Sequence, residues 1–88
     1  MITVEKIDER TFTVTVKGQT STTHTVVVDP SYHERLTGKR VSVEKLVEKS
    51  FEFLLERESN TSILRSFDLP VIGGYFPEYE HTIREMLA

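Results

Sequence analysis

Cysteine and tryptophan are absent from the 88-residue chain, which also contains only four glycines and three prolines. The absence of cysteine excludes a disulfide framework, a thiol nucleophile and a cysteine-ligated zinc site. Secreted domains of this length usually depend on disulfides, so we expect a protein of a reducing compartment, the cytoplasm. No run of about 18 apolar residues occurs, and the sequence therefore predicts neither a membrane-spanning helix nor a membrane partner.

Charge of both signs is present, but it is unevenly distributed. Residues 1–41 carry six Lys/Arg and five Asp/Glu, whereas residues 42–88 carry five and nine, and the net charge is −3. An acidic C-terminal half argues against a broad nucleic-acid surface there.

The N-terminal third has the alternating pattern of β-strands. Apolar and polar residues alternate in 2–5 and strictly in 11–17, and we expect a third strand at residues 22–28 after the polar turn 18–21. In a strand, every second side chain lies on the same face, so Phe12, Val14 and Val16 share one face. The sequence predicts a three-stranded antiparallel meander with one face to be covered by helices.

The remainder has the spacing of helices. Asp29-Pro30 is typical of a helix start, and Gly38 of its end. A long helix is expected from Ser42 to about Glu58, followed by a loop at 59–62. Residues 61–67 fit either a helical turn or an extended piece. We further expect one helical turn at 68–72, stopped by the double glycine 73–74, and a final helix from Pro77.

The long helix has an unusually wide apolar stripe. Val43, Leu46, Val47, Phe51, Leu54 and Leu55 follow helical spacing, and Phe53 widens the stripe beyond what one sheet face would cover. Either the C-terminal helices or another subunit must supply the second cover. The overall expectation is one α+β domain over residues 1–88, with the meander packed against the long helix and two or three shorter helices.

No catalytic, metal or cofactor motif is present. His24, His33 and His81 lie on separate elements without metal-ligand spacing, so we expect surface or half-buried roles for them. No serine lies in a strained-elbow sequence, and Ser50 is interpreted as a small residue that permits close helix packing. We therefore expect a protein that is not an enzyme and uses no cofactor.

A cluster of cations offers one candidate binding site. Lys39 and Arg40 precede a helix start, where free N–H groups favour anions, and further cations lie near in sequence. The candidate contacts for an anion or a nucleic acid are Arg35, Lys39, Arg40, Lys45 and Lys49. The phosphate-loop spacing is absent and glutamates are interspersed, so a solvated loop is the competing interpretation.

Aromatic residues offer a second candidate. Tyr75, Phe76 and Tyr79 follow the double glycine, and Phe53 lies on the widened stripe. Such residues anchor protein interfaces, but they also pack in cores, and both interpretations remain open.

Three stretches of the C-terminal half carry a family resemblance: residues 50–58 (SFEFLLERE), 62–69 (SILRSFDL) and 75–80 (YFPEYE). Over roughly residues 29–84 the chain resembles a group of short prokaryotic proteins of unknown function. The resemblance implies a stand-alone prokaryotic domain, without an activity or site residues. We expect a small interaction module that contacts a partner protein or a second copy of itself. The alternative is a nucleic-acid-binding regulator that uses the basic region 35–49.

Overall fold

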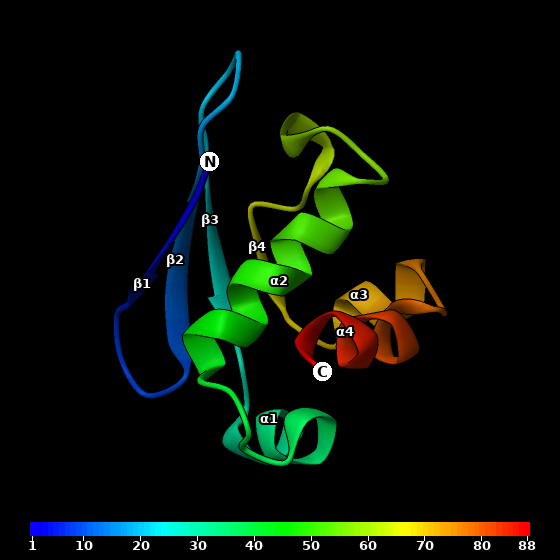
Figure 1. Cartoon of the computed structure of the whole chain (residues 1–88). Helices are drawn as coiled ribbons and strands as arrows, with labels where there is room; N and C mark the ends of the chain where they lie inside the picture. Colours follow the sequence, from blue (N-terminus) through cyan, green and yellow to red (C-terminus); the bar gives the residue numbers. More distant parts are fainter.

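The computed structural model describes all residues, 1–88, and shows a four-stranded sheet with helices on one side (Figure 1). The elements in chain order are β1 (Ile2–Lys6), β2 (Thr11–Val16), β3 (Thr22–Val27), α1 (Pro30–Thr37), α2 (Val43–Leu55), the 3₁₀ turn η1 (Asn60–Ser62), β4 (Ser66–Asp68), α3 (Val71–Tyr75) and α4 (Tyr79–Leu87). The α+β class is confirmed.

The first three strands pair as the alternation predicts. β1 and β2, and β2 and β3, are antiparallel neighbours. Phe12, Val14 and Val16 are buried on the helix side, whereas Thr3 and Thr25 are exposed on the opposite face. The helices leave that second face uncovered (Figure 1).

The sheet itself is larger than predicted, because β4 adds a fourth strand parallel to β3. The expected three-stranded meander is therefore wrong in strand number and in type of pairing. Thr25 N–H donates to the Arg65 carbonyl at 2.7 Å, and Leu69 N–H donates to the Val27 carbonyl at 2.9 Å. These bonds, with the inward side chain of Phe67, keep this segment extended. Asp68 consequently ends a strand, and the helical turn expected at 68–72 is corrected.

The predicted helix caps are largely confirmed. The Asp29 carboxylate accepts from Ser31 N–H at the start of α1, and Gly38 ends this helix with a φ of 65°. Ser42 accepts from Lys45 N–H at the start of α2. The long helix ends at Leu55, earlier than expected, because the chain tightens into a turn at residues 56–58.

The two C-terminal helices differ from the prediction: α3 ends later than expected, and α4 begins later. α3 runs through the double glycine at 73–74, although glycine is a poor helix former. Its turn is maintained by buried Ile72, whose carbonyl accepts from Phe76 N–H at 2.8 Å. α4 begins at Tyr79 and not at Pro77.

The hydrophobic core lies between the sheet and α2, and it contains 18 buried residues. α4 covers the second side of α2, where Phe53 lies in edge contact with the rings of Phe76 and Tyr79, at centroid distances of 5.9 and 5.3 Å. The wide stripe is thus covered by the chain's own C-terminal helix. None of the helices is long and apolar enough to cross a bilayer.

Candidate functional site

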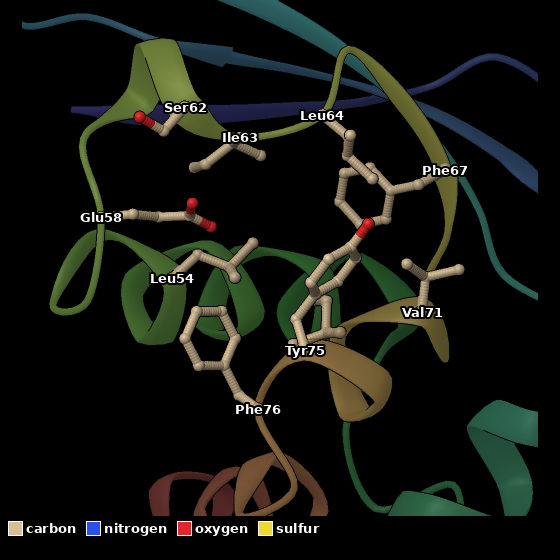
Figure 2. Close-up of a pocket in the computed structure, with 10 residues that line it drawn as sticks. Leu54, Glu58, Ser62, Ile63, Leu64, Phe67, Val71, Tyr75 and Phe76 are labelled. Atoms are coloured by element: carbon tan, nitrogen blue, oxygen red, sulfur yellow. The ribbon is translucent and has the colours of Figure 1, made fainter.

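An apolar hollow lies between the end of α2, the η1–β4 segment and α3 (Figure 2). Its volume is about 140 Å³, and eight of its ten lining residues are hydrophobic. We call it the apolar groove; it is lined by Leu54, Glu58, Ser62, Ile63, Leu64, Phe67, Val71, Ile72, Tyr75 and Phe76. A cavity of about this size holds a benzene-sized group, so the groove can accept one aliphatic or aromatic side chain.

Three large apolar side chains on the wall of the groove are exposed. The exposed fractions are 46% for Leu64, 37% for Val71 and 67% for Tyr75. The side chains of Leu64 and Tyr75 converge over the ring of Phe67 in Figure 2. Grouped exposure of this kind is typical of a binding surface, whereas single exposed apolar residues are common on any protein.

The upper wall of the groove is attached to β3 by a buried histidine. His24 Nδ1 lies 2.7 Å from the Leu64 carbonyl, and Nε2 lies 2.8 Å from Thr22 Oγ1. Because a carbonyl oxygen can only accept, Nδ1 carries the proton of this bond. The Asn60 amide also donates to the Thr20 carbonyl at 2.6 Å. The segment that presents Leu64 is therefore held at two points.

The lower wall is attached through Arg57. Its guanidinium lies 3.6 Å from the centroid of the Phe53 ring and donates to the Phe53 carbonyl at 3.0 Å. It also pairs with Glu78 at 3.1 Å. One cation thus links the end of α2 to the segment between α3 and α4, on which Phe76 lies.

A buried polar pair connects α2 to α4. Ser50 Oγ donates to the Leu46 carbonyl and accepts from the Tyr79 hydroxyl, each at 2.7 Å. Burial raises the pKa of Tyr79 above its ordinary value, which keeps the hydroxyl protonated as a donor. Ser50 is therefore a hydrogen-bonding residue as well as the small packing residue that the sequence indicates.

The four aromatic interface candidates separate into two groups. Phe53 and Tyr79 are fully buried within the chain's own core, so their expected role as interface residues is corrected. Tyr75 is exposed and Phe76 is half-buried, and both line the apolar groove. The core interpretation thus applies to Phe53 and Tyr79, and an interface role of Tyr75 and Phe76 stays a prediction.

The basic candidates are mostly paired with carboxylates. Arg35 pairs with Glu80 at 3.2 Å, Lys45 with Glu48 at 3.4 Å and Lys49 with Glu52 at 3.2 Å. Lys39 and Arg40 form no ion pair and lie exposed in the loop between α1 and α2. The region therefore has two unpaired cations and not a continuous basic surface.

The Arg35–Glu80 pair joins the surfaces of α1 and α4. The hydrogen bond from Arg35 and a second from the Tyr32 hydroxyl hold the pKa of Glu80 below its ordinary value. Arg35 thus has a structural contact on the protein's own surface.

The histidines do not converge. His24 and His33 are buried, which corrects the expected surface or half-buried role, and His33 Nε2 bonds the Val41 carbonyl at 2.7 Å. His81 is exposed on α4, 3.6 Å from Glu85. No group of three or more His, Cys, Asp or Glu side chains could hold a metal ion.

No family model, curated protein or solved structure matches the chain. The geometry of the groove therefore carries the functional argument.

Sequence reasoning found Tyr75 and Phe76 but missed Leu64 and Val71. Aliphatic residues close to a helix or strand are ordinarily assigned to the core, and these two show no pattern that distinguishes them. The available signal was the cluster of apolar residues at 63–72, which is denser than one short strand and one helical turn can bury.

Proposed function

We propose that the protein is a non-enzymatic interaction module that binds an extended segment of a partner protein at the apolar groove. The observation that carries this proposal is the joint exposure of Leu64, Val71 and Tyr75 around one hollow. Small hollows with mostly apolar walls bind by burying an apolar group, and the groove matches this description.

The free edge of β4 supports an extended conformation for the bound segment. In the pairing with β3, the backbone groups of Phe67 point towards β3, whereas those of Ser66 and Asp68 point to the open side. A segment added beside β4 would bond to these free groups and place alternate side chains towards the helix side, where the groove lies.

Glu58 supports a basic residue in the partner segment. It lines the groove and forms no ion pair within the chain. A Lys or Arg beside the inserted apolar side chain would pair with this carboxylate. Such pairs at the rim chiefly raise the association rate and the specificity.

Selection from a displayed library of random linear peptides tests the proposal. We expect enriched peptides to combine a large apolar residue with a neighbouring Lys or Arg, and their affinity to fall at least about tenfold, or about 1.4 kcal/mol, in Tyr75→Ser. The matched control is Ile7→Ser, which removes a similarly exposed apolar side chain directly after β1, outside the lining of the groove. Equal binding by Tyr75→Ser and the natural sequence would contradict the proposal.

The alternative nucleic-acid role remains a prediction. The ion pairs of Arg35, Lys45 and Lys49 reduce the positive potential that binding to a phosphate backbone requires.

A further inference from the structure

The outer edge of β1 is unpaired and forms the left-hand border of the sheet in Figure 1. Met1 and Lys17 exchange backbone bonds of 2.9 and 3.0 Å across the β1–β2 pair. In an antiparallel pair such bonded positions recur at every second residue, so the odd-numbered residues of β1 bond to β2. The backbone groups of Ile2, Val4 and Lys6 consequently point to the open side.

Apolar side chains mark both ends of this edge. Met1 is 81% exposed and Ile7 is 56% exposed, and they are two of the five large apolar residues that the surface exposes. The other three surround the apolar groove. An unpaired edge that is free of proline and flanked by exposed apolar residues is a template for pairing with another strand.

We infer that a second copy of this chain docks on this edge, with the two β1 strands antiparallel about a two-fold axis at Val4. Val4 then faces Val4 of the second copy, and Ile2 faces Lys6. Both are bonded pairs, because all of these residues direct their backbone groups outward. Met1 faces Ile7 of the second copy, so the two exposed apolar side chains at the ends of the edge cover one another.

The charges select this register among those that the backbone permits. Glu5 lies opposite Thr3 of the second copy, and no like charges face each other. A shift of one residue along each strand in one direction places Glu5 opposite Glu5, which is unfavourable. The same shift in the other direction centres the pair on Thr3 and places Met1 opposite Glu5, so the exposed side chains of Met1 and Ile7 no longer face each other. The register at Val4 also uses the full length of the strand.

The helix side of the edge borders a hollow. Ile2 and Val4 are half-buried against the core, and a hollow beside Val4 is bounded by Ser42, Glu44, Lys45 and Glu48 of the α2 region. The side chain of Val4 of the second copy points to this side and would lie next to the hollow. Pairing would thus continue the sheet into the second copy, with the α2 helices of both copies on the same side of it.

Substitutions at Thr3 test both the docking and its register. Thr3 is exposed on the open sheet face, so its replacement leaves the core intact. Sedimentation equilibrium of the full chain from low to high micromolar concentration should show a monomer–dimer equilibrium. We expect Thr3→Lys, which faces Glu5 of the second copy, to tighten the dimer about two- to tenfold, and Thr3→Glu to weaken it by a similar factor. Both effects should diminish in high salt.

Backbone and side-chain variants complete the test. Val4→Pro removes an outward N–H without removing a bond to β2, and it should weaken the dimer at least tenfold while circular dichroism shows a folded chain. If this variant does not fold, Ile7→Ser provides the second measurement, with Tyr75→Ser as its matched control, and only Ile7→Ser should weaken the dimer. A monomer at high micromolar concentration, or a dimer that responds to Tyr75→Ser and not to the Thr3 variants, would overturn the inference.

Discussion

The meander at residues 1–28 and the C-terminal segment at residues 56–88 are stabilised in different ways. In the meander, continuous backbone ladders join β1, β2 and β3, and the inward side chains repeat along each strand. The C-terminal segment has short elements, which are attached by the three-residue strand β4, by buried side chains and by single side-chain bonds such as His24 to Leu64 and Tyr79 to Ser50.

The regular part of the fold and the candidate binding surface therefore lie in different regions of the chain. A regular ladder distributes its stability over many equivalent bonds, whereas an irregular segment depends on a few attachments. The exposed side chains of the apolar groove all belong to the irregular segment. Leu64 can stay exposed because its neighbours hold it in place: its carbonyl accepts from His24, the Arg65 carbonyl accepts from Thr25, and the side chain of Ile63 is buried.

The largest expected loss of stability comes from a substitution in the meander. Phe12→Ala removes a fully buried ring that faces the core from β2. We expect it to lower the free energy of unfolding by about 3–5 kcal/mol, because it removes buried apolar contacts and leaves a cavity. Urea unfolding followed by circular dichroism measures this change.

The control is Thr25→Ala on the open face of β3, whose side chain is exposed. It should cost less than about 1 kcal/mol. If Phe12→Ala cost no more than this control, the meander would not be the main source of stability, and the comparison would fail.

The same division explains how much could be read from the sequence. The period-two alternation around Phe12 and the caps Asp29 and Gly38 are local signals, and they predicted three strands and α1 correctly. The fourth strand has a single inward residue, Phe67, between polar neighbours. Its parallel pairing depends on the path of the chain through α1 and α2, which no local pattern encodes.

The errors in the C-terminal half have a similar cause. The double glycine indicated a stop, but the packing of Ile72 imposes a helical turn in spite of low propensity. Two of the four aromatic candidates, Tyr75 and Phe76, line the groove, and their interface role stays a prediction. The burial of the other two, Phe53 and Tyr79, could not be read from the sequence, because it depends on how α4 packs against α2.

The second prediction concerns a point attachment of the C-terminal segment. Ser50→Ala leaves the buried Tyr79 hydroxyl without an acceptor. An unsatisfied buried hydroxyl costs about 1–3 kcal/mol, so we expect the free energy of unfolding to fall by this amount. Removing both partners, in Ser50→Ala combined with Tyr79→Phe, should cost less than the sum of the two single variants.

A double-mutant cycle from urea unfolding of the four proteins measures this coupling. The matched control is Tyr32→Phe, whose hydroxyl bonds to Glu80 nearer the surface and should show no coupling to Ser50. If the losses in free energy of unfolding from Ser50→Ala and Tyr79→Phe were strictly additive, the bond between the two hydroxyls would not stabilise the packing of α4 on α2.

The smallest expected effect is a gain of stability in the irregular segment. Gly74 lies in α3 with a negative φ, and a methyl group added there would meet no atom within 4 Å apart from its chain neighbours and the backbone of α3 itself. Gly74→Ala should therefore raise the free energy of unfolding by about 0.4–1 kcal/mol, because alanine restricts the unfolded chain and favours the helix. Gly38→Ala is the matched control. Gly38 has a φ of 65°, which alanine adopts only with strain, so this variant should lower the free energy of unfolding by about 1–2 kcal/mol. If Gly74→Ala lowered the stability, α3 would not be a helical turn that the core holds in place, and the wall of the apolar groove would need a different explanation.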